Sequence, residues 1–279
     1  MSRTFPRRCR ALALSLWLLA IPIFVRAQSV EFVRMPRDVI EKRLKRAPEK
    51  NADRQAALKE LFEESGGTGE RLDLQKVKRS RIPNVICTLA GQTDSVIVVG
   101  AHFDKTEKGK GVADNWSGAA LLPSLLEGLA QTPRRHTYVF VGFTDEEIGL
   151  VGSRHYAKQL RPEERKKVKA MVNVDTLGLE TTRVWESRSA PNLVETLAQT
   201  AASLKLPLAI SNVELVGSTD SESFREQGIP SISIHTVTDE TFPILHTSQD
   251  NFESIRLDDY YDSYRMILAF LALLDLKLD

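Results

Sequence analysis

The sequence predicts a three-layer α/β/α sandwich around a mostly parallel, mixed central sheet. Short β-branched apolar runs alternate with helical patterns from residue 84 onward, which is the order typical of parallel strands connected by helices. The runs Val96–Val99 and Tyr138–Val141 are apolar at every position, as expected for central strands that helices cover on both faces. The 279 residues are 42% hydrophobic and 27% charged, a composition that is typical of a globular domain and excludes a mainly disordered chain.

The individual elements follow from the same patterns. The expected strands are Asn84–Leu89, Ser95–Ala101, Thr137–Thr144, Ala170–Asp175, Pro207–Glu214 and Ser231–His235. The expected helices are Trp116–Gln131, Gly152–Leu160, Pro191–Leu204, Ser221–Gln227 and a closing Leu257–Leu276. Together they form one domain, which we place at residues 80–279.

A helical lead-in precedes this domain. The stretch Asp38–Ser65 is charged and helical in pattern, with Asn51 able to cap Ala52–Glu64 and Gly66-Gly67 able to end it. We therefore expect residues 28–79 to pack on the domain at residues 80–279 as a lead-in.

The first 27 residues have the pattern of a secretory signal peptide. A basic start is followed by an apolar run, Ala11–Val25, and Val25-Arg26-Ala27 offers small residues at the two positions a signal peptidase reads. The alternative is a membrane anchor, but the run is shorter than the roughly 20 residues that a spanning helix needs. We expect cleavage after Ala27 and a secreted or periplasmic protein.

Cysteine content and charge limit the possible partners. Cys9 would leave with the signal, so Cys87, within an apolar strand, would be the remaining thiol and no intramolecular disulfide could form. Five arginines and no acid lie in the first 27 residues, so the rest of the chain is mildly acidic although the whole carries 38 basic and 37 acidic side chains. This balance predicts neither nucleic acid nor, after signal removal, membrane as a partner.

Polar side chains interrupt the apolar pattern where the expected strands end. Seven of them are candidates for chemistry: His102, Asp104, Asp114, Glu146, Glu147, Asp175 and His246. The carboxyl ends of strands in an open α/β sheet form the edge where ligands bind. We therefore expect these segments to converge there.

Convergence would gather five carboxylates. Two of them about 4 Å apart repel by about 4 kcal/mol at an effective dielectric near 20, so the cluster must protonate, spread apart or hold cations. Two divalent ions nearly cancel its charge. Two histidines in the set disfavour calcium and magnesium and favour zinc, with manganese and cobalt as alternatives.

The chain resembles the M28 metallopeptidases, the secreted co-catalytic zinc aminopeptidases, over roughly residues 80–276. Six segments carry the resemblance, in family order: Gly100-Ala101-His102-Phe103-Asp104, Gly111–Gly118, Asp145–Ser153, Asn173-Val174-Asp175, Gly228-Ile229-Pro230 and His246–Asp250. The resemblance implies a zinc-aminopeptidase-like fold and two zinc ions per chain. It implies these roles: Asp114 bridges the ions, His102 and Asp175 complete one site, Glu147 and His246 complete the other, Glu146 is the general base, and Asp104 orients the His102 ring.

These roles agree with elementary chemistry. Zinc lowers the pKa of bound water towards about 7, so a hydroxide shared by two ions is available at neutral pH. An adjacent carboxylate that binds no metal can accept and deliver its proton. The expected function is hydrolysis of N-terminal peptide bonds in peptide substrates by an exported aminopeptidase.

Three alternatives remain open. A glutaminyl-peptide cyclotransferase resembles these peptidases but uses one zinc ion. A carboxypeptidase or other hydrolase could use the same scaffold, and a metal-free binding module is the third alternative.

Some positions depart from the family pattern. Trp116 replaces a residue that is often small, so it either lines the substrate pocket or packs at a helix start. Leu245 precedes the last ligand, where some members carry an oxyanion-assisting tyrosine and cyclotransferases typically carry tryptophan. Thr219-Asp220 lies near the expected cleft or caps a helix. His235 is a further candidate for the cleft.

Overall fold

The computed structural model describes Met1 and residues 32–213 and 217–279. The predicted signal peptide at residues 1–27 therefore lies outside the described residues, apart from Met1. Within the described ranges, none of the helices combines the length and apolar character needed to cross a membrane.

A single mixed sheet of eight strands forms the middle layer, in the order β1-β2-β4-β3-β5-β8-β6-β7. The strands are β1 (Leu72–Gln75), β2 (Asn84–Leu89), β3 (Val96–His102), β4 (Thr137–Phe143), β5 (Val168–Val174), β6 (Arg183–Val184), β7 (Ala209–Ile210) and β8 (Ser231–His235). The four central strands β4, β3, β5 and β8 run parallel. The pairs β1–β2, β2–β4 and β6–β8 are antiparallel, and the edge strand β7 runs parallel to β6. The predicted mixed, mostly parallel core of the sheet is confirmed.

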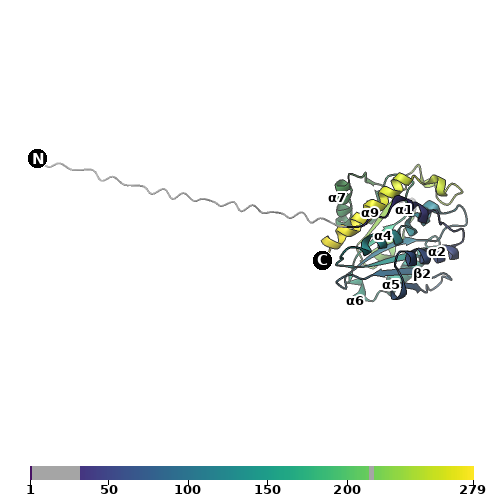
Figure 1. Ribbon diagram of the computed structural model, residues 1–279, viewed down its shortest axis with the longest axis horizontal. Helices are drawn as coiled ribbons and strands as arrows, with labels where there is room; N and C mark the ends of the chain where they lie inside the picture. The colour runs from purple at the N-terminus through teal and green to yellow at the C-terminus, as the bar shows by residue number, and fades with distance from the viewer. Residues whose placement is uncertain (2–31, 214–216) are drawn as a thin grey trace.

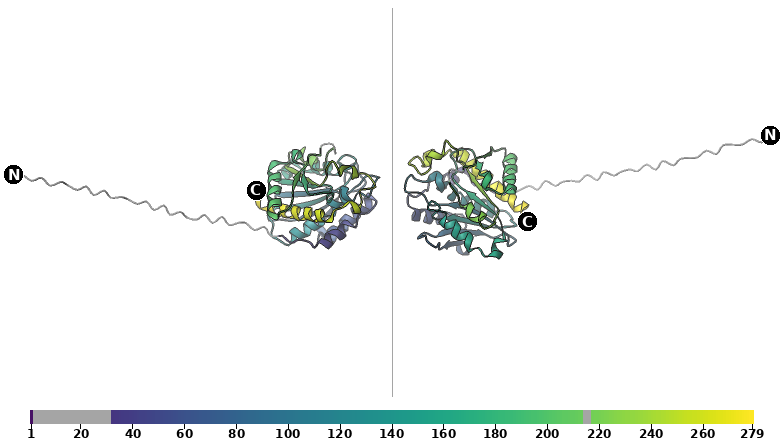
Figure 2. Two further views of the ribbon diagram at one scale, coloured as in Figure 1. Left: turned by 90° about the horizontal axis from the view of Figure 1, so that it is seen from above. Right: turned by 180° about the vertical axis from the view of Figure 1, so that it is seen from behind.

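Helices cover both faces of this sheet (Figures 1 and 2). They are α1 (Arg37–Leu44), α2 (Asn51–Glu64), α3 (Ser117–Ala119), α4 (Leu122–Ala130), α5 (Val151–Gln159), α6 (Pro162–Arg165), α7 (Pro191–Leu204), α8 (Ser221–Arg225) and α9 (Leu257–Lys277). Ile97 and Val99 of β3 pack on the side of α2, α4, α7 and α9, and Val98 between them packs on the side of α5 and α8. This alternation explains why the run Val96–Val99 is apolar at every position.

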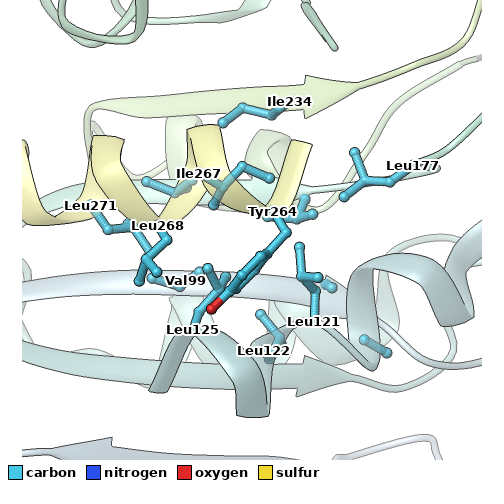
Figure 3. Close-up of a cluster of buried hydrophobic side chains, with 14 of the residues drawn as sticks. Val99, Leu121, Leu122, Leu125, Leu177, Ile234, Tyr264, Ile267, Leu268 and Leu271 are labelled. Atoms are coloured by element: carbon cyan, nitrogen blue, oxygen red, sulfur yellow. The ribbon is translucent and has the colours of Figure 1, made fainter. Parts of the chain in front are cut away.

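The closing helix α9 forms the centre of the larger core. Figure 3 shows Tyr264, Ile267, Leu268 and Leu271 of α9 lying over Val99 of the sheet and the leucines of α4. All four α9 side chains are fully buried. The apolar C-terminal run therefore serves core packing.

The lead-in shares this core. Ile40 and Leu44 of α1 and Leu58 and Phe62 of α2 are buried in the same cluster as α4 and α9. The boundary between a lead-in at residues 28–79 and a domain at residues 80–279 stays a prediction, because one continuous core includes both.

Two expected elements are wrong in extent. The predicted helix Trp116–Gln131 is interrupted at Ala120 and Leu121, between α3 and α4. Pro123 lies in the first turn of α4, where it has no N–H to continue a hydrogen-bond ladder from α3. The predicted strand Pro207–Glu214 pairs only at Ala209–Ile210, and its last residue lies outside the described ranges.

The strands β1 and β6 and the role of Asn51 were not predicted correctly, whereas the environment of Cys87 was. The strands β1 and β6 were missed because four and two residues respectively are too few for a hydrophobic pattern to register. Asn51 is the first residue of α2 rather than its cap, and its side chain bonds the backbone of Lys105 instead. Cys87 is a buried free thiol, as expected.

Truncating a buried α9 side chain should measure the weight of this core. Leu268 is 0% exposed, so Leu268→Ala should lower the free energy of unfolding by about 2–5 kcal/mol through lost burial and an unfilled cavity. Leu276→Ala on the same helix is the control, because this side chain is 40% exposed and the change should stay within about 0.5 kcal/mol. Urea denaturation measures both, and equal losses would contradict the assignment of α9 to the core.

Candidate metal centre

Three adjacent strands deliver the first candidate residues to one edge of the sheet. His102 is the last residue of β3, Asp175 directly follows β5, and Glu146 and Glu147 follow β4. Since β4, β3 and β5 are parallel neighbours, their carboxyl ends meet at the same edge. His246 reaches this edge from the loop after the short helix Phe242–Ile244.

Asp114 lies at the centre of the candidates and faces two groups of donors. Its Oδ1 is 3.2 Å from Nε2 of His102, and that nitrogen is 3.5 Å from Oδ1 of Asp175. Its Oδ2 is 3.0 Å from Nε2 of His246, and that nitrogen is 3.0 Å from Oε2 of Glu147. One carboxylate thus separates two clusters, each with one imidazole and one further acid.

Asp104 links the two strand ends beneath these clusters. Its carboxylate accepts hydrogen bonds from the backbone N–H groups of Glu146 (3.0 Å) and Glu147 (3.2 Å). The same carboxylate is 3.5 Å from Nδ1 of His102. Asp104 therefore holds the Glu146-Glu147 turn and faces the side of the His102 ring opposite to Asp114.

Asp175 is held by hydroxyl groups. Thr219 donates to its Oδ2 at 2.8 Å and Thr176 donates to its Oδ1 at 3.2 Å. The Thr219 oxygen in turn accepts from the buried Asn173 amide at 2.5 Å. Thr219 thus orients a candidate ligand and lies at the cleft, as the first of its two interpretations expects. The neighbouring Asp220 makes no side-chain hydrogen bond that would cap α8.

The backbone around Asp114 is fixed by residues that the sequence analysis did not single out. Asp250 accepts hydrogen bonds from the N–H groups of Ala113 (2.7 Å) and Asp114 (3.2 Å). Asn115 donates to the carbonyl of Val174 at 2.9 Å. Both residues lie in the segments that carry the family resemblance, but their spacing alone does not reveal which backbone groups they bind.

The clustered acids and imidazoles shift one another's pKa values. Burial alone would lower the pKa of His102, yet Glu146, Asp104, Asp114 and Asp175 together raise it well above its usual value. Hydrogen bonds to Asp114 and Glu147 raise the pKa of His246 to about 10. The acids around both rings thus favour the protonated form of each imidazole.

The pKa values of the two glutamates are raised as well. Burial raises the pKa of Glu146 well above its usual value, with His102 opposing and nearby acids adding to the rise. Burial also raises the pKa of Glu147, and the hydrogen bond to His246 opposes this rise. Both shifts follow from carboxyl groups that are withdrawn from water beside other acids.

The donor set fits divalent metal ions. Ligand atoms of His102, Asp114 and Glu147 all lie within 4.8 Å of one another, and the buried Oε1 of Glu147 has no hydrogen-bond partner. Imidazole nitrogens mixed with carboxylate oxygens suit zinc better than calcium or magnesium. Residues on either side of Asp114 could hold one ion each.

A cavity of about 270 Å³ opens over these residues. Apolar side chains form part of its wall: Leu150, Trp185, Val213, Val237 and Leu245. His235 also lines it, and burial lowers the pKa of this ring to about 4. Trp116 is instead fully buried, and its indole donates to the carbonyl of Arg43 at 3.2 Å, so its packed interpretation is correct.

Comparison with known proteins follows this geometry. The sequence profile described as Peptidase family M28 matches residues 84–271. The chain belongs to peptidase family M28. The predicted family is thereby confirmed.

The curated M28 relatives are longer proteins. An aminopeptidase of Pseudomonas aeruginosa is 40% identical over 102 residues, which are 36% of this chain and 19% of that relative. This M28 chain therefore spans about a fifth of that relative's length.

Solved structures share the fold. LapA from Legionella pneumophila aligns with a TM-score of 0.77 at 22% identity, over 86% of this chain and 73% of LapA. A zinc aminopeptidase from Bacillus subtilis aligns with a TM-score of 0.63 at 24% identity, over 71% and 50% of the two chains. A glutaminyl cyclase from an Acidobacteriales bacterium aligns with a TM-score of 0.72 at 20% identity, over 91% and 99%.

Zinc affinity should rise with pH. Because the pKa of His246 is raised to about 10, its proton stabilises the metal-free fold below the ordinary histidine pKa of about 6.5. That stabilisation is lost as the pH rises through about 10, and a metal ion must displace the same proton. Chelator competition at about pH 6 and about pH 8 should show tighter binding at the higher pH.

One variant tests the role of His246 in this prediction, and a second variant is the control. His246→Gln should weaken zinc binding and flatten its pH dependence. His155→Gln, on α5, should leave both unchanged. Equal zinc affinity of the unmodified protein at the two pH values would contradict the prediction.

Proposed function

We propose that this M28 chain is an exported metallo-aminopeptidase that uses two zinc ions. The observation that carries the proposal is the placement of Asp114, whose two oxygens lie 3.2 Å and 3.0 Å from different imidazoles. One carboxylate between two donor clusters is the arrangement that a bridging ligand requires. The aminopeptidase and zinc aminopeptidase names of its relatives support the activity and the metal. Export rests on the N-terminal sequence pattern.

Each side chain has a proposed role. Asp114 would be shared by the two ions, His102 and Asp175 would hold one of them, and Glu147 and His246 would hold the other. Zinc, when bound, supplies the Lewis acidity that polarises a scissile carbonyl and acidifies water. Asp104 positions the His102 ring and the Glu146-Glu147 turn at the same time, as the contacts of its carboxylate indicate.

Glu146 is the proposed general base. Its side chain lines the cavity with the candidate ligands, while its neighbour Glu147 makes the contact to His246. Burial raises the pKa of Glu146, and a carboxylate whose pKa lies closer to neutrality both accepts a proton from water and returns it to a leaving amine.

The apolar residues that line the cavity indicate a class of substrate. Leu150, Trp185 and Leu245 lie in its wall with His235, whose pKa is lowered to about 4 and whose ring is therefore uncharged at neutral pH. An uncharged apolar wall stabilises an apolar side chain by removing its surface from water. The acid side chains that also line the cavity favour the free amine of a peptide. We infer preference for peptides that begin with a leucine-like residue.

Replacing the base should separate chemistry from metal binding. Glu146→Gln keeps the side-chain shape and removes the proton acceptor, so turnover should fall by about 10²–10⁴-fold while zinc content is unchanged. Glu147→Gln is the matched control and should lower zinc affinity instead. Measuring kcat together with bound zinc tests both, and full activity of zinc-loaded Glu146→Gln would place the base elsewhere.

Glutaminyl-peptide cyclotransferase is the second candidate function. The glutaminyl cyclase from the Acidobacteriales bacterium is matched over 99% of its length, and Trp185 provides an aromatic ring in the cavity wall. The position before His246 is Leu245, which cannot stack on a substrate as tryptophan does. This difference favours hydrolysis.

A small substrate panel decides between the two functions. The zinc-loaded protein should release free leucine from a leucyl peptide, act little on its N-acetylated form, and release no ammonia from a glutaminyl peptide. The N-acetylated form lacks the free amine that an aminopeptidase binds. Hydrolysis adds water to the first peptide bond and leaves the glutamine side chain intact, so no ammonia is released. Ammonia with pyroglutamate formation, and no free leucine, would establish the second candidate instead.

A further inference from the structure

Arg54 is a buried cation outside the segment that matches the family. It lies on α2, before the matched residues 84–271, and is 0% exposed. A buried guanidinium must have its N–H groups satisfied, because leaving them unpaired away from water is costly. Its partners therefore show what the lead-in contributes to the domain.

Those partners belong mainly to the loop between His102 and Asp114. The Arg54 side chain donates to the carbonyl of Phe103 at 3.1 Å and to that of Gly111 at 3.0 Å, and also to the carbonyl of Lys110. Phe103 stands between His102 and Asp104, and Gly111 precedes Asp114 by three residues. One planar group thus holds both ends of the loop that connects these candidate ligands.

Further contacts of α2 strengthen this attachment. Asn51, one turn earlier, donates to the carbonyl of Lys105 at 3.2 Å and accepts from its N–H at 3.1 Å. The Arg54 guanidinium also lies 5.6 Å from the centre of the Trp116 ring. Two residues of one helix consequently bind the loop near its start, at Phe103 and Lys105, and near its end, at Lys110 and Gly111.

The charge of Arg54 complements the acids near it. Burial lowers its pKa to about 10, opposed by the negative charges of Asp250, Asp104 and Asp114, so the guanidinium stays protonated at neutral pH. Behind a cluster of carboxylates, this fixed positive charge reduces their mutual repulsion. The hydrogen bonds of Arg54 hold the loop that carries Asp104 and Asp114, and its positive charge stabilises the same two carboxylates.

We propose that Arg54 is a positioning residue for the metal centre: by binding the carbonyls of Phe103 and Gly111 it sets the separation between His102 and Asp114 and so increases zinc affinity. This inference rests on the proposed function. Through Arg54, the lead-in would contribute to the metal centre, although none of its described residues lines the cavity.

Arg54→Met and Arg54→Lys test the proposal in the full-length protein. Removing a residue that orients metal ligands typically lowers metal affinity by about 10–100-fold, which we expect for Arg54→Met. Arg54→Lys keeps the charge but not the planar fork, so its affinity should lie between those of Arg54→Met and the unmodified protein. Chelator competition with zinc alone measures affinity, and the absorption spectrum of bound cobalt should shift as the ligand geometry changes.

Arg43→Met is the matched control. Arg43 is also a buried lead-in arginine, but its guanidinium binds Ser124 at 2.7 Å and Glu127 at 2.7 Å on α4, away from the metal loops. It should lower the thermal midpoint without changing zinc affinity or the cobalt spectrum. Affinities are compared at a temperature at which circular dichroism shows every variant folded.

The outcomes separate the two proposals. Zinc binding by the unmodified protein with unchanged affinity in Arg54→Met would overturn the role of Arg54 alone. If Arg54→Met does not fold, Arg54→Lys decides: reduced affinity with an altered cobalt spectrum supports the role, and unmodified behaviour overturns it. Absence of zinc binding by the unmodified protein would overturn the proposed metal centre and this inference together.

Discussion

Asp114 presents one carboxylate oxygen to His102 and the other to His246, 3.2 Å and 3.0 Å away. Because a carboxylate is rigid and planar, both imidazoles must approach it from fixed directions. His102 comes from the end of β3, and His246 comes from a loop about 140 residues further along the chain. Two further acids accompany these histidines, since Asp175 lies 3.5 Å from His102 and Glu147 lies 3.0 Å from His246.

A second layer of polar groups makes the shared contact possible. Asp250 binds the backbone on which Asp114 is carried, Asp104 binds the turn of Glu146 and Glu147, and Arg54 binds the loop between His102 and Asp114. Each of them satisfies backbone groups that burial would otherwise leave unpaired. The candidate ligands are thereby preorganised by side chains that do not face the proposed ions.

The same scaffold serves more than one chemistry among its relatives. LapA and the glutaminyl cyclase from the Acidobacteriales bacterium align with TM-scores of 0.77 and 0.72, so the fold alone does not select a reaction. The cavity wall of this chain combines an aliphatic Leu245 directly before His246 with the ring of Trp185 from another segment.

Apolar periodicity and the order of the M28 segments were enough to predict the family, the layered fold and the candidate residues. The prediction missed the break before Pro123, although a proline without an N–H is itself a local signal. It also misjudged Asn51, whose amide binds Lys105 instead of capping α2. The folded chain, and not its sequence, shows which oxygen of Asp114 faces which histidine. The folded chain also shows that Arg54 binds the loop between His102 and Asp114. The sequence could not predict this contact, because a hydrogen bond to a distant backbone carbonyl requires no particular residue type or spacing.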